Sequence, residues 1–357
     1  MTALTEIIAR RIAAVGPMTL ADYMAECLLH PVHGYYTTRP PFGAEGDFIT
    51  APEISQMFGE MLGLSLAMAW LDQGAPSPVA LTELGPGRGT LMADMLRAVR
   101  NVPGLSDAVE VHLVEASPRL RLAQERTLAG YAVQWHDRIE DLPEMPLLLV
   151  ANEFFDALPI RQFTRSSGGW RETQIVQEAG TLRFALGLTT RPGFLEHRIR
   201  DTVESDVVEH CPAAGPIMTV LARRIATHGG AALIVDYGGW HSLGDTFQAL
   251  RHHAPEDPLA RPGAADLTAH VDFEALAFAA RVVPDIQLSA LTPQGVLLER
   301  LGITARAQVL ARGLTGAALE AHVAAHRRLT HPEEMGSLFN CIALTPGGSQ
   351  LPPGLTA

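Results

Sequence analysis

The feature that most constrains this chain is a repeated order of apolar segment, turn and amphipathic helix between residues 79 and 151. Residues 79–84 form a short apolar run, glycines dominate 85–89, and residues 90–100 carry apolar side chains at helical spacing. This order is typical of parallel sheets, because parallel strands need a long crossover connection and a helix usually supplies it. Further strands are predicted at 109–115, 131–135, 147–151, 231–236, 285–290 and 338–344.

These seven predicted strands indicate an α/β fold, namely one elaborated Rossmann-like domain whose sheet is mostly parallel. We expect residues 1–75 to form a helical N-terminal extension, with helices broken at Gly16 and a loop rich in glycine and proline at 30–52. Residues 76–357 would form the main domain. Its predicted insertions are a β-rich and helical one at about 160–228, after strand four, with hairpins at 162–188, and a helical one at about 293–330, after strand six.

The charge of the chain excludes several classes of function. Its net charge is −12, and its few arginine pairs are scattered, so no basic track for nucleic acid is predicted. All basic residues other than histidine are arginines. Without a lysine the chain cannot perform Schiff-base chemistry or hold phosphate as P-loop proteins do.

The cysteines and the hydropathy pattern indicate where such a chain works. Cys27, Cys211 and Cys341 are far apart and form no C-x-x-C pair, which favours buried thiols in a reducing compartment over a disulfide or zinc site. No apolar run approaches the roughly 20 residues of a membrane span. We therefore expect a cytoplasmic protein without membrane insertion or a resident metal.

The glycine-rich turn is the strongest chemical signal. Glu83 stands before Gly85, Gly87 and Gly89, and the spacing is G-x-G-x-G. Dinucleotide sites favour G-x-G-x-x-G, which disfavours a nicotinamide-dependent oxidoreductase. An acidic residue before this turn suits S-adenosyl-L-methionine, whose amino group is cationic. The alternative is a glycine-rich turn that holds no ligand.

Two further strand ends could complete a nucleoside site. Glu115 ends the second strand, where a carboxylate can accept hydrogen bonds from both ribose hydroxyls. His136 and Asp137 follow the third strand, where they could contact adenine. Glu115 could instead be a solvated strand end, and either of the other two could cap a helix.

The fourth strand leads into Asn152, Glu153 and Asp156, at the edge where ligands of open parallel sheets bind. The prolines of the Asn/Asp-Pro-Pro-Tyr motif of DNA and protein-amide methyltransferases are absent here. Two carboxylates suit a guanidinium group, which they can bind bidentately. The alternative is structural, with Asp156 capping a helix and Glu153 in its first turn.

Two other segments carry polar residues in unusual density. Asp47, Thr50 and Pro52 precede a predicted helix at 54–71. Residues 266–272 place acidic residues, a threonine and His270 on alternate positions, hence on one face if extended. That segment could be a metal cluster, a proton-handling site, or a strand-to-helix turn with Asp272 as N-cap.

Several segments together resemble the MidA family of Rossmann-like, class I methyltransferases that use S-adenosyl-L-methionine. They are GDFITAPEISQMFGE, ELGPGRGTLMADMLR, ANEFFDALPIRQF, DYG, DLTAHVDF and MGSLFN, in this order. The resemblance implies a bacterial relative of the mitochondrial member, which is an assembly factor of respiratory complex I. That member acts on an arginine of the large quinone-site subunit of NADH dehydrogenase, so the resemblance also implies protein arginine methylation.

The resemblance also assigns roles to matching positions. It implies that Glu83 and the glycines hold the methionine part, Glu115 the ribose, and that Asp47, Thr50 and Pro52 close over the cofactor. Glu153 and Asp156 would receive the guanidinium, with His270 nearby. A non-catalytic assembly chaperone, a methyltransferase for another guanidine or small molecule, and a homodimer all stay open.

Overall fold

The computed structural model describes residues 2–38 and 50–357, which divide into two compact units. We call one the sheet unit, which comprises Ile49–Phe155, Gly215–Gly238 and Phe273–Ala357. The other, the insertion unit, comprises Met1–Phe48, Asp156–Ala214 and Gly239–Asp272. These bounds differ from the predicted division at residue 75, because the helix after residue 55 packs in the core of the sheet unit.

The sheet unit contains the predicted parallel sheet. Its strands follow the order β15-β17-β10-β5-β2-β3-β4. Pairing is parallel from β10 through β4, and β17 runs antiparallel to β10 and β15. The strands are β2 (Val79–Leu84), β3 (Val109–Val114), β4 (Val133–His136), β5 (Leu147–Asn152), β10 (Gly230–Gly239), β15 (Ile286–Leu288) and β17 (Phe339–Pro346). All seven predicted strands are confirmed, and a short strand that the sequence did not reveal, β16 (Thr292–Pro293), also pairs with β17.

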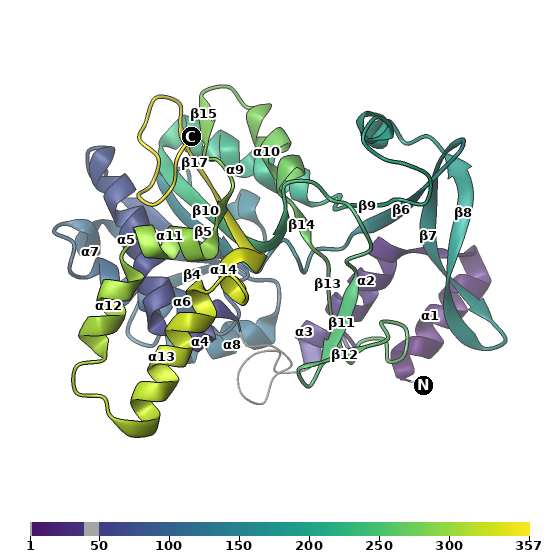
Figure 1. Cartoon of the computed structure of the whole chain (residues 1–357), viewed down its shortest axis with the longest axis horizontal. Coiled ribbons are helices and arrows are strands. Elements are labelled where there is room, and N and C mark those ends of the chain that lie inside the picture. The colour runs from purple at the N-terminus through teal and green to yellow at the C-terminus, as the bar shows by residue number, and fades with distance from the viewer. Residues whose placement is uncertain (1, 39–49) are drawn as a thin grey trace. The chain divides into compact units, whose positions relative to one another are not determined.

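Helices of this unit pack against the sheet (Figure 1). Leu81, Leu148 and Leu233, on three neighbouring strands, share a core cluster with Phe58 and Met92 from two helices. β2 and β5 are buried along their whole length and are mostly apolar, with Thr82 and Glu83 as the polar residues of β2. The helices of this unit are α4 (Ala51–Ile54), α5 (Gln56–Asp72), α6 (Thr90–Val99), α7 (Leu105–Ala108), α8 (Pro118–Thr127), α9 (Ala214–His228), α10 (Phe273–Arg281), α11 (Gln294–Arg300), α12 (Ile303–Leu310), α13 (Gly316–Thr330) and α14 (Met335–Leu338).

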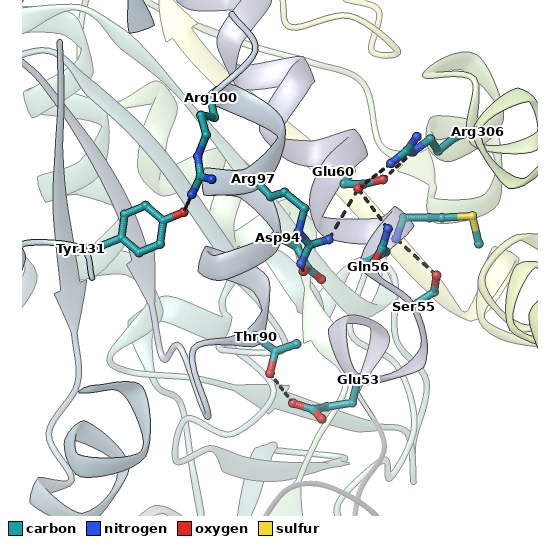
Figure 2. A network of polar contacts seen from close by, with 11 residues as sticks. Glu53, Ser55, Gln56, Glu60, Thr90, Asp94, Arg97, Arg100, Tyr131 and Arg306 are labelled. Carbon is teal, nitrogen blue, oxygen red and sulfur yellow. Dashed lines mark hydrogen bonds and ion pairs between the residues drawn. The ribbon is translucent and has the colours of Figure 1, made fainter. Parts of the chain in front are cut away.

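A buried carboxylate joins three of these helices (Figure 2). Glu60 of α5 is 4% exposed and accepts two hydrogen bonds from the guanidinium of Arg306 on α12, at 2.7 and 2.9 Å. It also accepts one from Gln56 at 3.2 Å and lies 3.6 Å from Arg97 of α6. A buried carboxylate needs such partners, since loss of hydration would otherwise favour its neutral, protonated form.

The insertion unit combines the N-terminal helices with antiparallel strands. Gly16, with φ +94°, ends the first helix as predicted. The predicted hairpins at 162–188 are confirmed, because β7 pairs antiparallel with both β6 and β8. The elements are α1 (Ala3–Val15), β1 (Met18–Thr19), α2 (Leu20–Leu29), α3 (Tyr35–Thr38), β6 (Arg161–Ser166), β7 (Gly169–Glu178), β8 (Thr181–Thr190), β9 (Val207–His210), β11 (Gln248–Arg251), β12 (Ala254–Glu256), β13 (Asp266–Thr268) and β14 (Val271–Asp272).

Two general expectations can be compared with the structure. Cys27 and Cys341 are buried free thiols and Cys211 is partly buried, in agreement with the prediction of thiols without disulfides. In the described part of the chain, no helix combines the length and hydropathy required to cross a bilayer.

Candidate active site

The glycine-rich turn connects β2 to α6 and requires glycine for two reasons. Gly85, Gly87 and Gly89 have φ values of +62°, +51° and +83°, a region that side chains with a Cβ rarely adopt. A Cβ on Gly85 would also lie 2.9 Å from Cδ2 of Phe154. The bare backbone therefore permits close approach of a ligand to the N-terminus of α6, where unpaired N–H groups favour anionic groups.

Glu83 lies beneath this turn, on the second-last residue of β2. It is 3% exposed, and its Oε2 has no hydrogen-bond partner among the described residues. Burial raises the pKa of Glu83 to about 8, although a hydrogen bond from the backbone of Met92 acts in the opposite direction. A buried carboxylate with a free acceptor atom is suited to a cationic ligand group, which would stabilise its charge.

Glu115 follows β3 and is connected to the glycine-rich turn through a glutamine. Its Oε1 accepts from the backbone N–H of Ser117 at 2.7 Å, and its Oε2 accepts from Nε2 of Gln124 at 3.2 Å. The same Nε2 donates to the carbonyl oxygen of Gly87 at 2.9 Å. Burial raises the pKa of Glu115 to about 7. The alternative of a solvated strand end is therefore wrong, and Gln124 is a further candidate site residue that the sequence did not reveal.

His136 and Asp137 occupy the end of β4. Nε2 of His136 lies 2.9 Å from Nδ1 of His112 on β3, and burial lowers the pKa of His112 to about 4 and that of His136 in the same direction. Asp137 pairs with Arg121 at 2.6 Å. Neither residue caps a helix, since the next helical turn has Arg138 as its N-cap.

Glu153 follows β5 in a strained turn, with φ +50°. Its Oε1 accepts from the backbone N–H of Ala51 and from Nδ2 of Asn152, both at 3.1 Å. Burial raises the pKa of Glu153 to about 7. Oδ2 of Asp236 holds the turn by accepting from the backbone N–H groups of Phe154 and Phe155, at 3.1 and 2.9 Å.

The structure of the turn after β5 contradicts one interpretation of the sequence and shows one further buried polar residue. No helix begins at 153–156 in the described chain, so the alternative in which Asp156 caps a helix containing Glu153 is wrong. The fully buried Asp236, which lies in the DYG segment, was not predicted as a site residue. An acidic residue near the end of a wholly apolar strand was the available signal.

Comparison with known proteins identifies the family to which this chain belongs. The family model described as "Putative S-adenosyl-L-methionine-dependent methyltransferase" matches residues 61–290. The chain belongs to this methyltransferase family.

Individual relatives extend the match over nearly the whole methyltransferase. The protein arginine methyltransferase NDUFAF7 of Danio rerio mitochondria is 40% identical over 94% of this chain and 85% of its own length. The Homo sapiens counterpart is 37% identical over 94% and 82%. A Burkholderia thailandensis protein solved with bound S-adenosyl-homocysteine has a TM-score of 0.86 at 29% identity, covering 99% of this chain and 94% of that one.

The donor set in the sheet unit fits the cofactor of this family. Glu83 offers an open buried acceptor for an ammonium group, and Gly85, Gly87 and Gly89 have no Cβ that would narrow the approach to the turn. Glu115 retains lone pairs for hydroxyl groups, since each of its oxygens can accept more than the one bond from Ser117 or Gln124.

The segment 50–54 connects to the glycine-rich turn. Thr50 is the N-cap of α4 and Pro52 stands in its first turn. Glu53, which was not predicted as a site residue, accepts from Oγ1 of Thr90 at 2.6 Å (Figure 2) and from Arg88 at 3.4 Å. The predicted Asp47 lies outside the described residues, and closure over the cofactor by this segment stays a prediction.

Asp156 and His270 belong to the insertion unit, so their predicted place beside Glu153 stays a prediction. Asp156 is 5% exposed and its carbonyl oxygen accepts from the N–H of Ala269 at 3.1 Å. The N–H of His270 donates to Oγ1 of Thr246 at 2.8 Å, and partial burial lowers the pKa of its ring.

The segment at 266–272 resolves into β13 and β14, and α10 begins directly after Asp272. Within 2–38 and 50–357, no group of three His, Cys, Asp or Glu side chains is arranged to hold a metal ion. The metal-cluster alternative therefore finds no support in the described segment. A strand-to-helix transition is observed, as the third alternative predicted.

Proposed function

We propose that this methyltransferase methylates a guanidinium nitrogen of an arginine side chain in a protein. Glu153 is the observation that carries the proposal. Its carboxylate is fixed by Ala51 and Asn152 in a turn whose next residue, Phe154, packs against the glycine-rich turn. The names of the mitochondrial relatives, which specify protein arginine methylation, support it.

The cofactor would be held by residues of the sheet unit. Glu83 would bind its ammonium group, the N–H groups of Gly87 and Arg88 its carboxylate, since those of Gly85 and Gly89 donate to backbone carbonyl oxygens, and Glu115 its ribose hydroxyls. His136 and Asp137 would lie against the adenine, and Asn152 would face the methionine part. S-adenosyl-L-methionine, when bound, supplies a methyl group on a positively charged sulfur.

Glu153 would bind and orient the substrate. Both of its hydrogen bonds from the described residues go to Oε1, which leaves Oε2 to accept from the guanidinium. The cation would keep Glu153 ionised despite burial, because a nearby opposite charge favours the charged form of a carboxyl. After the nitrogen gains its methyl group, Glu153 can accept the proton that the nitrogen loses. Alignment of this kind accounts for much of the rate enhancement of displacement reactions.

The protein substrate that we propose is a subunit of NADH-quinone oxidoreductase under assembly, specifically its large quinone-site subunit. The family resemblance of the glycine-rich, ANEFFDALP and DLTAHVDF segments supports this choice. Asp156 and His270 would assist at the guanidinium. The cytoplasmic location and the homodimer left open by the sequence stay predictions.

The variant Glu153→Gln tests the proposal. We expect unchanged S-adenosyl-L-methionine affinity by calorimetry and a loss of at least about 100-fold in methyl incorporation, since one catalytic acid–base group contributes about 10²–10⁴. The matched control is Glu125→Gln, which removes an exposed carboxylate of α8. The assay follows tritiated methyl transfer into complex I subunits from cells that lack the methyltransferase, with methylarginine located by mass spectrometry.

Two results would contradict the proposal in different ways. Unchanged turnover in Glu153→Gln would remove the role assigned to this carboxylate. Cofactor binding without methylarginine on any complex I subunit, combined with capture of an unmodified subunit, would favour the chaperone. Methyl transfer to a free guanidine instead would favour a small-molecule enzyme.

A further inference from the structure

The insertion unit contains a cavity of about 360 Å³ that includes no residue of the cofactor site. It opens between β7, β8 and the segment before β11. Its lining includes Gln162, Thr173, Phe184, Leu186, Asp245 and Phe247. Its size and mixed lining are within the range of small-ligand and side-chain pockets.

The floor of this cavity is a fixed polar network. Oγ1 of Thr173 donates to Oε1 of Gln162 at 2.9 Å, which orients the amide of Gln162. Nε2 of Gln162 then donates to Oε1 of Glu209 at 3.1 Å and to Oδ1 of Asp245 at 2.8 Å. Gln162, Thr173 and Glu209 are each at least nine-tenths buried. The carboxylate of Asp245 is therefore held in place although the residue is exposed.

The network carries negative charge without a protein cation. Glu209 accepts from the N–H groups of Thr246 and Phe247, at 3.0 and 3.2 Å, and all its donors are neutral. Burial raises the pKa of Glu209, and the charge of Asp245 raises it further. Among the described residues, no arginine or histidine pairs with either carboxylate. Arg171 instead donates to the carbonyl oxygens of Leu186 and Gly187, both at 3.0 Å.

The walls are apolar and continue onto an edge strand. Phe184 and Phe247 meet edge to face with ring centroids 6.3 Å apart. In the described chain β8 pairs with β7 alone, and both strands lie together in Figure 1. Phe184 and Leu186 alternate along β8 and are 45% and 40% exposed, so one face of β8 presents these apolar side chains beside the cavity.

We infer that this cavity binds the side chain of a second arginine of the protein substrate, flanked by apolar residues that lie along β8. A guanidinium pairs with a fixed carboxylate and stacks on aromatic rings, and it is less strongly hydrated than an ammonium group. The identity of the partner as a methylated protein rests on the proposed function, whereas the preference of the cavity for a guanidinium does not.

The test compares two capped tripeptides, acetyl-Leu-Arg-Leu-amide and the same peptide with neutral citrulline in place of arginine. Calorimetry without S-adenosyl-L-methionine measures their Kd for the full-length protein carrying Glu153→Gln, which weakens binding at the catalytic centre. We expect about fivefold tighter binding of the arginine peptide, at the upper end of a partly exposed ion pair. Asp245→Asn should remove this preference.

Two further variants guard against an effect on folding. Glu204→Gln removes an exposed carboxylate of the same unit and should preserve the preference. Leu186→Arg would place a guanidinium beside Asp245 and should weaken binding of the arginine peptide without a change at Asp245. Asparagine retains the oxygen that accepts from Gln162, so Asp245→Asn should keep the melting temperature.

Equal affinities for the arginine and citrulline peptides would overturn the inference. So would an Asp245→Asn variant that behaves like Glu204→Gln. A failure of the proposed function looks different, because methylarginine would then be absent while the charge preference of the cavity persisted.

Discussion

The raised pKa of Glu83 predicts how cofactor affinity depends on pH. In the free protein this carboxyl has a pKa of about 8 because it is buried. An ammonium group at its free Oε2 requires the ionised form. Binding must therefore release a proton below pH 8, and affinity should rise as pH approaches 8 from below.

The pKa sets the size of this effect. If the complex holds Glu83 ionised throughout, the fraction of free protein able to bind falls to roughly one in ten at pH 7 and one in a hundred at pH 6. Because about half of the free protein is ionised at pH 8, Kd should rise about fivefold between pH 8 and pH 7 and about tenfold between pH 7 and pH 6. Above pH 8 the gain ends, because the α-amino group of the cofactor itself loses its proton near pH 8.

Glu83→Gln is the matched control, since a glutamine resembles the protonated carboxyl. The variant keeps the titration of the ligand and that of Glu115, whose pKa is about 7. Calorimetry at pH 6, 7 and 8 in two buffers of different ionisation enthalpy measures both Kd and the protons released. A wild-type Kd that follows the same pH profile as Glu83→Gln would refute the assigned role of this residue.

Two other variants, Gly85→Ala and Arg306→Gln, test the architecture of the sheet unit, and each has a matched control. Gly85→Ala must adopt φ +62° and place a Cβ 2.9 Å from Phe154, so we expect a loss of about 2–3 kcal/mol in unfolding free energy together with weaker cofactor binding. Gly16→Ala is the control, because Gly16 has a positive φ but open space around its Cβ position. Chemical denaturation should show a loss of about 1 kcal/mol in its unfolding free energy, with unchanged cofactor affinity. Arg306→Gln leaves the buried Glu60 with Gln56 and the more distant Arg97, and should cost about 1–2 kcal/mol. The exposed Arg312→Gln should stay within about 0.5 kcal/mol, and equal losses for these two arginines would contradict the role of the network.

Local patterns in the sequence were sufficient to predict the strands of the sheet and the polar residues at the strand ends. The apolar runs of β2 and β5 are buried on both faces, so their composition alone marks them as central strands. Glu83, Glu115 and Glu153 could be predicted as candidate site residues because parallel strands present their carboxyl ends at one edge of the sheet. The glycines were identifiable because positive φ angles restrict the residue type there.

Other residues depended on contacts between segments that are distant along the chain. Gln124 joins Glu115 to Gly87, and Asp236 fixes the turn at Phe154 from a strand more than 80 residues later. The cavity beside β8 combines Gln162, Glu209 and Asp245 from three separate stretches. No rule of sequence spacing predicts these long-range hydrogen bonds, because the partner of a side chain depends on strand register and on the conformation of the loops. The sequence by itself therefore determined the sheet and the polar residues at the ends of its strands, and only the tertiary structure decided which polar groups were paired and which had no partner among the described residues.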